Sequence, residues 1–555
     1  MFSARDTACR SPPKLDESAE KKPASQFGGG DRAAVRCVMD VSRAADDMLA
    51  GVDLRRRVIS DSLDPTNRAR LGQFFTPCVV AQFMASLPAL PVVGPVRILD
   101  PGAGNGSLTA ALVARIVVER PDLDISVTAF EIDEALGPEL EQTLVECQVL
   151  ARTVGREMSF RLIAEDFLEW AAATVPDAHT ANEVDLFDIV IMNPPYRKVN
   201  VTAFERLALQ RINVEITNLY VGFSAMAVAL LSSNGQLTAI TPRSFTNGPY
   251  FRSFRRYFFD KMRFDRLHVY ESRSTAFADD AVLQENVIFN AHRYSIAGAD
   301  PVVSISTSKG PGDSATEREV LHSEIVVPGD ADCFVHIAID DADAELGRLL
   351  VALPHRLTDL GLDVSTGRVV DFRATEYLRF EDEMGTVPLI YPGHLRGGKV
   401  DWPGNLRKKP SWIADCTATK SLLLPSQTYV LVKRFTAKEE RRRVVASVFD
   451  PAFVLGHDVA FENHLNVFHI KGQGLSPDIA RGLAVWLNST IVDRYVRSFS
   501  GHTQINATDL RRLPYPSTEE IQRLGAGVDQ STLADQDSID ALVASLVGEL
   551  RFLAA

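Results

Sequence analysis

The chain has 555 residues, of which 46% are hydrophobic and 24% are charged, a composition typical of a globular protein with about two to four domains. It contains no apolar run of the roughly 20 residues that span a bilayer and no apolar core of a secretory signal, and its six cysteines are too scattered for a disulfide framework or a zinc site. The net charge of −13 argues, taken alone, against nucleic acid as a partner, because phosphates are bound by cations.

The predicted elements fall into an α/β half and a mixed α+β half. A helix is predicted from about residue 46 to 62, after a Ser-, Pro- and Gly-rich start. From Leu71 to Arg293, apolar runs alternate with amphipathic segments, which predicts a parallel sheet. The expected division is a disordered extension at 1–45, an α/β domain at 46–300, a second domain at 301–516 and a helical tail at 517–555, whose apolar stripe is expected to pack on its own domain.

A glycine-rich loop lies between the first predicted strand and the helix expected at 107–118. Pro101-Gly102-Ala103-Gly104-Asn105-Gly106 carries glycine at alternate positions, which lets the backbone approach a ligand closely. The strand before it ends in Asp100, which suits an ammonium group better than a pyrophosphate. The next strand ends in Glu131, in position to hold ribose hydroxyls. A loop of this kind alone is often only a tight turn, but these two acids together predict a nucleoside cofactor that carries an ammonium group.

A third predicted strand end, after residues 160–163, carries Asp166 and Phe167. The carboxylate can accept a hydrogen bond from an adenine amino group, and the aromatic ring can cover the base. In isolation this pattern is more often an ordinary strand-to-helix turn.

The apolar run 187–192 ends in the tetrapeptide Asn193-Pro194-Pro195-Tyr196. Two consecutive prolines cannot continue a strand, so they fix a rigid loop. The side-chain carbonyl of Asn193 and the main-chain carbonyl of Pro194 can then both accept from one amino group. Such acceptors draw the nitrogen towards sp³ geometry and turn its lone pair towards an electrophile, while Tyr196 offers a face for a planar group.

These two motifs resemble those of the N6-adenine DNA methyltransferases of restriction-modification systems, in the gamma order of motifs, and Leu71–Pro77 resembles the segment that precedes the cofactor loop in that group. The resemblance implies a Rossmann-like, S-adenosylmethionine-dependent methyltransferase domain followed by a target-recognition domain. It implies that Asn193, Pro194, Pro195 and Tyr196 are catalytic, that Phe75, Thr76, Asp100, Gly102, Gly104, Gly106, Glu131, Asp166 and Phe167 bind the cofactor, and that no metal is required.

The resemblance becomes looser beyond the tetrapeptide. Residues 235–242 resemble a later strand of the same fold and residues 277–288 a closing hairpin, next to which Phe289 is our candidate for an aromatic that stacks on the target base opposite Tyr196. Residues 487–489 and 501–514 resemble target-recognition regions.

A DNA substrate requires local positive charge in an acidic chain. Basic residues cluster in three segments, at 251–273, at 396–409 beside Trp402 and Trp412, and at 433–443. Each cluster alone is typical of a solvated face, but together they predict a basic cleft between the two halves and an acidic outer surface.

The function that the resemblance implies is site-specific methyl transfer to the N6 amino group of an adenine, extruded from duplex DNA, without a covalent enzyme intermediate. It further implies double-stranded DNA as substrate, a cognate restriction endonuclease as functional partner, a monomer or homodimer, no membrane association, and a bacterial cytoplasmic location at the nucleoid. Two alternatives keep the chemistry: methylation of another amino group, rRNA guanine N2 or a protein glutamine, and a modification subunit that needs a separate specificity protein. A non-catalytic scaffold is a third. The segment 72–77 and the long region after residue 297 favour DNA and built-in recognition.

Overall fold

The computed structural model describes residues 29–62, 74–175, 186–198, 209, 212–215, 217–271, 285–294, 300–404, 406, 408–436, 439–453, 457–501 and 503–554, without side chains at 29–38 and 549–554. The elements of the first half are α1 (Gly29–Ser62), α3 (Cys78–Ser86), β1 (Val96–Asp100), α4 (Ser107–Glu119), β2 (Ile125–Phe130), α5 (Gly137–Thr153), β3 (Met158–Ile163), α6 (Phe167–Thr174), β4 (Phe187–Met192), α8 (Leu219–Ala229), β5 (Leu231–Pro242), η1 (Arg243–Thr246), η2 (Pro249–Phe251), α9 (Arg252–Lys261), β6 (Met262–Tyr270), β7 (Asn286–Arg293), β8 (Val302–Ser308) and β9 (Thr316–Leu321).

Within the described residues, nine strands form one sheet in the order β3-β2-β1-β4-β5-β7-β6-β8-β9. Strands β1 to β5 pair in parallel, whereas β7 runs antiparallel between β5 and β6. The order changes direction at β1 and β4, whose carboxyl ends therefore lie side by side at the switch point where open α/β sheets bind ligands. This is the predicted Rossmann-like arrangement.

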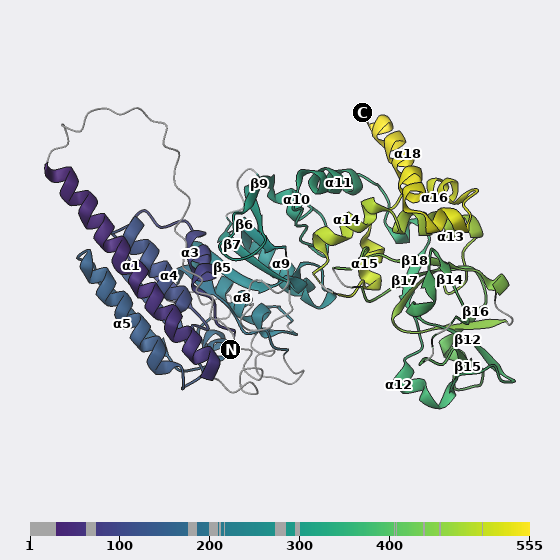
Figure 1. The fold of residues 1–555 in the computed structure, drawn as a ribbon, viewed down its shortest axis with the longest axis horizontal. Coiled ribbons are helices and arrows are strands. Elements are labelled where there is room, and N and C mark those ends of the chain that lie inside the picture. The colour runs from purple at the N-terminus through teal and green to yellow at the C-terminus, as the bar shows by residue number, and fades with distance from the viewer. Residues whose placement is uncertain are drawn as a thin grey trace, which may run out of the picture.

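Helices cover both faces of this sheet (Figure 1). On one face, α1, α3, α4 and α5 pack against inward-facing strand residues such as Ile98 and Ile189. On the other, α6, α8 and α9 pack against residues of the opposite parity, such as Leu99 and Val190. The alternation follows from the two-residue period of a strand, and burial on both faces explains why β1 and β4 are apolar throughout their centres.

The second half consists of two small sheets and a group of helices. Its elements are α10 (His322–Ile325), α11 (Asp341–Val351), η4 (Leu357–Leu360), β10 (Asp363–Thr366), α12 (Asp371–Ala374), η5 (Thr375–Tyr377), β11 (Leu378–Arg379), β12 (Thr386–Ile390), η6 (Pro392–His394), β13 (Leu395–Arg396), β14 (Lys399–Val400), β15 (Trp412–Ala414), η7 (Lys420–Leu422), β16 (Leu423–Pro425), β17 (Tyr429–Lys433), β18 (Ala446–Phe449), η8 (Pro451–Phe453), β19 (Asp458–Phe461), β20 (Leu465–His469), α13 (Pro477–Leu487), α14 (Thr490–Phe499), α15 (Ala507–Arg512), α16 (Thr518–Gly525), α17 (Gln530–Ala534) and α18 (Gln536–Ala554). In the described residues the sheets run β10-β20-β17-β18-β14-β13 and β11-β15-β12-β19-β16, with an apolar core between them.

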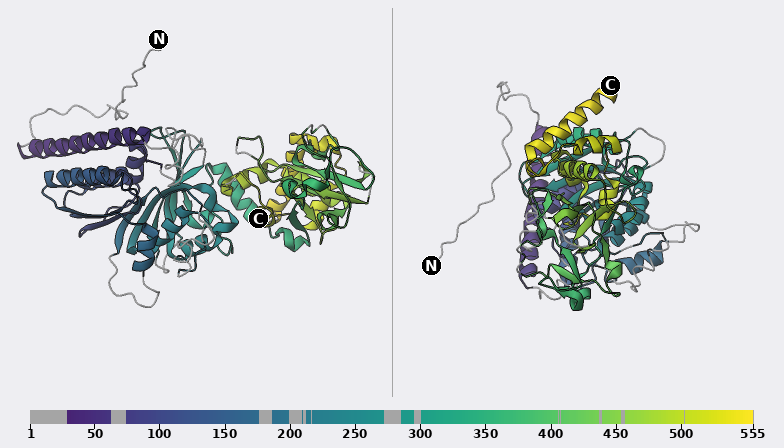
Figure 2. Two further views of the ribbon diagram at one scale, coloured as in Figure 1. Left: turned by 90° about the horizontal axis from the view of Figure 1, so that it is seen from below. Right: turned by 90° about the vertical axis from the view of Figure 1, so that its right-hand side faces the viewer.

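The two halves lie end to end along the long axis of the molecule (Figure 2) and meet at the segments after β5 and after α14. The buried guanidinium of Arg243 donates to the carbonyl of Ser498 (2.6 Å), and the Asn247 amide donates to Asp509 (3.0 Å). A Cβ on Gly501 would lie 2.1 Å from the Arg243 carbonyl oxygen, so only glycine permits this approach. These contacts fix the second half against the end of the sheet where the predicted motifs lie.

Several predicted boundaries differ from the structure. Helix α1 begins at Gly29, so residues 29–45, predicted to be disordered, are helical; residues 1–28 lie outside the described residues. Strands β8 and β9 extend the first sheet past the boundary predicted at 300. Ile539 and Val543 of α18 are buried in the core of the second half, as predicted for the tail. Among the described residues, no helix has the length and apolarity needed to cross a bilayer.

Candidate active site

The glycine-rich loop connects β1 to α4 and closes over the carboxyl end of the sheet. Gly104 and Gly106 have φ angles of 57° and 84°, in the left-handed region that favours glycine. A Cβ on Gly106 would also lie 2.9 Å from the methyl carbon of Thr143. The loop therefore needs glycine at 106 both for its backbone conformation and for its packing on α5.

Asp100, at the end of β1, is fully buried behind this loop. Its Oδ2 accepts a hydrogen bond from the Thr109 hydroxyl (2.8 Å), whereas its Oδ1 is buried with no hydrogen-bond partner. Burial raises the pKa of Asp100 to about 7. An unpaired buried acceptor is costly, so this carboxylate is suited to a cationic ligand group.

Glu131, at the end of β2, is held in place by main-chain donors. Its Oε2 accepts from the amide of Gly104 (2.8 Å) and its Oε1 from that of Asp133 (2.8 Å). Desolvation by burial raises its pKa even though these bonds favour the ionised form. Each carboxylate oxygen has a second lone pair, so Glu131 can still accept from two neighbouring hydroxyls.

Asp166 caps α6, because its Oδ1 accepts from the amides of Leu168 (2.8 Å) and Glu169 (3.2 Å). This is the ordinary strand-to-helix turn, but Asp166 and the following Phe167 also line the pocket over the loop. We call this the loop pocket; its lining is Phe74, Phe75, Pro101, Gly102, Gly104, Phe130, Glu131, Ile132, Leu136, Glu165, Asp166, Phe167, Asn193, Pro195 and Phe223.

The loop pocket suits S-adenosylmethionine in the chemistry of its acceptors and in their order. In its lining, Glu131 matches ribose hydroxyls, and Asp166 with Phe167 matches an adenine. Asp100, whose Oδ1 suits an ammonium group, is buried behind the loop and outside this lining. Ile132, half exposed in the pocket, adds an apolar contact for the base that the motif analysis did not identify. It directly follows Glu131 at the strand end, where an apolar residue carries no distinctive sequence signal.

The tetrapeptide after β4 is fixed by the segment before α3. The Asn193 side-chain amide donates to the carbonyl of Phe74 (2.7 Å) and to the hydroxyl of Thr76 (3.1 Å). These two bonds fix which end of the amide is oxygen. The Asn193 Oδ1 accepts from the Tyr196 hydroxyl (2.9 Å), and burial raises the pKa of Tyr196 well above its usual value, so the phenol remains a donor. One lone pair of the Asn193 oxygen remains for a further donor.

Phe75 and Thr76 therefore differ in their surroundings. Phe75 lines the loop pocket and packs against Gly104, as expected for a cofactor contact. Thr76 is buried (5% exposed), lies outside the pocket lining and contacts Asn193 instead. Residues 71–73 of the same motif lie outside the described residues.

A second hollow, the interdomain cleft, lies on the other side of the tetrapeptide and has a volume of about 720 Å³. Asn193 and Pro195 line the loop pocket whereas Tyr196 lines the cleft, so the tetrapeptide separates the two spaces. The cleft is lined from the first half by Tyr196, Lys198, Thr217, Asn218, Tyr220, Pro242, Ser244, Pro249, Tyr250, Phe251 and Glu285, and from the second half by Arg434, Arg443, Gly501, Thr503, Gln504 and Asn506. The 501–514 segment singled out in the sequence thus borders the site.

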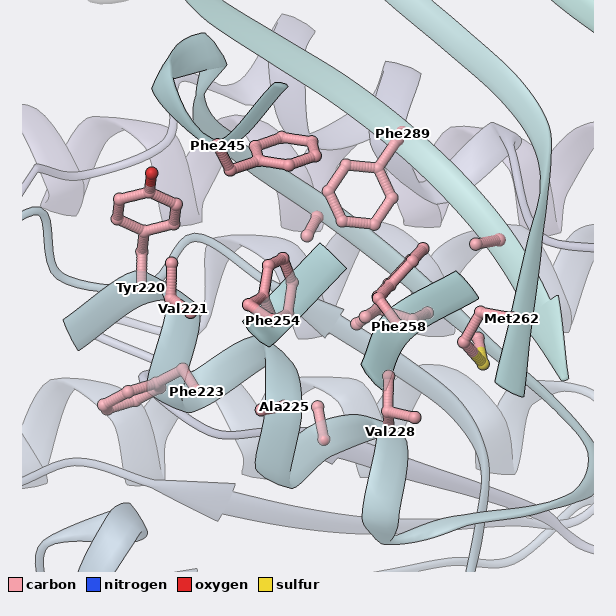
Figure 3. Close-up of a cluster of buried hydrophobic side chains, with 14 of the residues drawn as sticks. Tyr220, Val221, Phe223, Ala225, Val228, Phe245, Phe254, Phe258, Met262 and Phe289 are labelled. Atoms are coloured by element: carbon pink, nitrogen blue, oxygen red, sulfur yellow. The ribbon is translucent and has the colours of Figure 1, made fainter. Parts of the chain in front are cut away.

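Phe289 does not border the cleft. Its side chain is 2% exposed and packs among Phe245, Phe258 and Phe264 in the core beneath the sheet (Figure 3). The hypothesis that it stacks on a base opposite Tyr196 is therefore wrong. Residues 272–284 of the hairpin lie outside the described residues. The aromatic residues in the cleft lining are Tyr196, Tyr220, Tyr250 and Phe251.

The three predicted basic clusters have different roles. In the first, Arg255 is buried and donates to main-chain carbonyls, and Arg252 pairs with Asp332, so neither of these two arginines lines the cleft. In the 433–443 cluster, Arg434 and Arg443 line the cleft.

In the remaining cluster, the rings of Trp402 and Trp412 pack against each other, with 4.6 Å between their centroids. Lys409 forms an ion pair with Asp371. Among the described residues, no group of His, Cys, Asp and Glu side chains is arranged to hold a metal ion.

Comparisons of the sequence with known proteins give clear matches. Residues 133–277 match the family described as Eco57I restriction-modification methylase. The type II methyltransferase M.PstI of Providencia stuartii is 41% identical over 89% of this chain and 96% of its own length. The type II methyltransferase M.BsuBI of Bacillus subtilis is 40% identical over 87% of this chain and 94% of its own length.

The fold also resembles a solved structure. The type IIL restriction-modification enzyme MmeI, determined in complex with DNA, superposes with a TM-score of 0.51 at 10% identity, over 90% of this chain and 72% of that chain. At this identity the likeness concerns the fold, and it extends over both halves of the molecule.

Proposed function

The chain belongs to the type II methyltransferases of restriction-modification systems, and from this premise we propose that it transfers a methyl group from S-adenosylmethionine to the N6 amino group of an adenine extruded from duplex DNA. The observation that carries the proposal is the position of Asn193, between a pocket suited to a nucleoside cofactor and a cleft bordered by both halves.

The loop pocket, together with Asp100 buried behind the loop, binds and orients the cofactor. Asp100 pairs with its ammonium group, Glu131 with its ribose, and Asp166, Phe167 and Ile132 with its adenine. When bound, S-adenosylmethionine supplies an electrophilic methyl group on a sulfonium. The wall formed by Asn193 and Pro195 is then the side of the pocket nearest the interdomain cleft.

Asn193 and Pro194 activate the target amino group. The conjugated nitrogen of adenine is a weak nucleophile, and two carbonyl acceptors favour the pyramidal form in which its lone pair is available. The bonds from Asn193 to Phe74 and Thr76 support this role, because they leave the side-chain oxygen as the only end of the amide able to accept from the base. Tyr196, on the cleft side, is the candidate for stacking on the extruded ring.

Chemistry at an amino group, rather than at a ring carbon, agrees with the surroundings of the thiols. Methylation of a pyrimidine carbon needs covalent activation by a nucleophile such as a thiolate. The cysteines whose side chains the structure describes are Cys78, Cys147, Cys333 and Cys416, and none of these lines the loop pocket or the cleft. Burial also raises the pKa of Cys147 to about 12.

Recognition within the chain itself is supported by the cleft, because its second-half residues face the tetrapeptide across the space that a base would enter. The purified chain alone should therefore methylate duplex DNA. A chain that is active only after addition of a separate specificity protein would contradict this part of the proposal.

The proposal is tested by offering duplex DNA, rRNA and a release factor in parallel, with S-adenosylmethionine labelled in its methyl group. We expect label on DNA only. Asn193→Ala should lower the rate by at least about 100-fold, by analogy with loss of one polar group that acts on the reacting centre. Asn234→Ala, at an exposed position of β5, is the matched control. Label on rRNA or protein, or full activity of the Asn193 variant, would refute the assignment.

A further inference from the structure

An open groove of about 420 Å³ lies on the second half, and it is not part of the site described above. Its lining includes Tyr391, Leu406, Lys409, Phe435, Glu462 and His464. Phe435 follows β17 and residues 462–464 connect β19 to β20, so the groove lies where neighbouring strands of the two sheets end.

The groove is continuous with the interdomain cleft through the main chain. Phe435 pairs with Gln504 in an antiparallel bridge, and the amide of Arg434 donates to the carbonyl of His464 (2.9 Å). Arg434 and Gln504 themselves line the cleft. The groove and the cleft are therefore neighbours, and a duplex bound at the cleft would pass beside the groove.

His464 is held in this groove in one orientation. Its Nδ1 lies 2.7 Å from Oε1 of Glu462, whose side chain is only 2% exposed, and its own amide donates to the other oxygen of that carboxylate (3.0 Å). The edge of the Phe435 ring packs against the imidazole, with 4.8 Å between ring centroids. The Glu462 carboxylate thus fixes Nδ1 as a proton-bearing nitrogen.

The other ring nitrogen has no such partner. The His464 side chain is 48% exposed, and its Nε2 makes no hydrogen bond to any residue in the described part of the chain. Beside it, the Phe435 side chain is 43% exposed. An oriented imidazole with an open ring nitrogen, next to an exposed aromatic ring, has the features of a site that reads base edges.

We infer that His464 is a specificity-determining residue, whose Nε2 forms a hydrogen bond with one base edge in the major groove of the recognised DNA, beside an apolar contact from Phe435. This inference rests on the proposed function. Glu462 is a positioning residue that acts through His464. Lys409 in the groove, which pairs with Asp371, and Arg434 in the adjoining cleft add positive charge that favours a phosphate-bearing partner.

Two substitutions of His464 distinguish a base contact made by Nε2 from a purely structural role of the side chain. Asparagine retains an amide near the position of Nδ1, so His464→Asn keeps the contact with Glu462 and removes Nε2. Glutamine reaches the position of Nε2, so His464→Gln retains a polar atom that can contact the base. His457→Asn, at the exposed opposite end of β19, is the matched control.

The experiment expresses each full-length variant in cells without DNA methylation and maps modified positions by modification-detecting sequencing. Unaltered protein should modify one sequence, and the His457 variant the same one. The His464→Asn variant should also modify sequences that differ from the recognised one at a single base position, with discrimination at that position reduced by about 10-fold. In the His464→Gln variant, discrimination at that position should fall by less. Binding of the purified proteins to the recognised duplex and to singly substituted duplexes gives the same comparison without turnover.

An unchanged recognition sequence with His464→Asn, or a uniform fall in methylation at every sequence, would overturn the inference, because a merely structural residue behaves in that way. Absence of methylation by the unaltered protein would instead refute the proposed function, and the inference with it.

Discussion

Replacing Thr76 with valine tests how the catalytic amide is held. Valine has nearly the same shape as threonine, so the substitution removes the hydroxyl that accepts from Asn193 Nδ2 (3.1 Å) while it keeps the packing of a buried side chain. The bond to the Phe74 carbonyl (2.7 Å) remains. One of the two amide hydrogens of Asn193 then has no partner.

The magnitude follows from the cost of an unsatisfied donor. A buried N–H without a partner costs about 1–3 kcal/mol, and the amide can recover part of it by rotating away from its catalytic orientation. If that free energy is lost from the transition state, kcat falls by about 5- to 150-fold. The Kd of S-adenosylmethionine should not change, because Thr76 lies outside the lining of the loop pocket.

The assay measures kcat by single-turnover methylation and the cofactor Kd by calorimetry, for the Thr76→Val and Thr76→Ser variants. Serine retains the hydroxyl and should restore most of the rate. A Thr76→Val protein that binds the cofactor more weakly, by the same factor as its loss of kcat/KM, would show that Thr76 contacts the cofactor, as the motif resemblance implies, and would refute the reasoning.

Three further predictions concern stability and can be checked by unfolding measurements. Because the pKa of Asp100 is raised to about 7, the folded, cofactor-free protein binds a proton more tightly than the unfolded chain does, and its stability should fall as the pH rises from about 4 to 7. Asp100→Asn should remove this pH dependence of stability and weaken cofactor binding. The same pH dependence in the variant would contradict the argument that burial raises this pKa. Gly106→Ala should destabilise the protein by about 1–3 kcal/mol, because of the positive φ and the clash with Thr143, and a Tm equal to that of the unaltered protein would contradict the prediction. Asp509→Ala should cost about 1–3 kcal/mol, because it leaves the Asn247 amide and the main-chain amide of Asn506 without their carboxylate partner at the junction of the halves. A loss below about 0.5 kcal/mol, on the order of a surface substitution, would count against these bonds.

The sequence predicted which polar side chains gather at the carboxyl edge of the sheet, for a physical reason. Asp100, Glu131, Asp166 and Asn193 each follow an apolar run, and the carboxyl ends of parallel strands meet at one edge of a sheet. Locating the apolar strands and the residues at which they end therefore places these four chemically distinct side chains together. Ile132 is invisible to this reasoning, since an apolar residue after a strand carries no distinctive pattern.

What the sequence could not predict depends on burial and on distant contacts. Counting cations in 251–273 cannot distinguish Arg255, which is enclosed by main-chain carbonyls, from Arg434, which lines the cleft. Phe289 has the composition expected of a stacking residue but the alternation of β7 turns it into the core. The hydrogen bond from Asn193 to Thr76 joins residues far apart in the chain, and no local pattern reports it.

The central claim is that the base modified is adenine, at its N6 amino group. Its most direct test is incubation of the purified chain with S-adenosylmethionine and unmethylated duplex DNA, complete digestion to nucleosides, and mass spectrometry of the methylated product. The account predicts N6-methyladenine from the unaltered protein and none above background from Asn193→Ala. Detection of N4-methylcytosine or 5-methylcytosine as the product, with no N6-methyladenine, would contradict it.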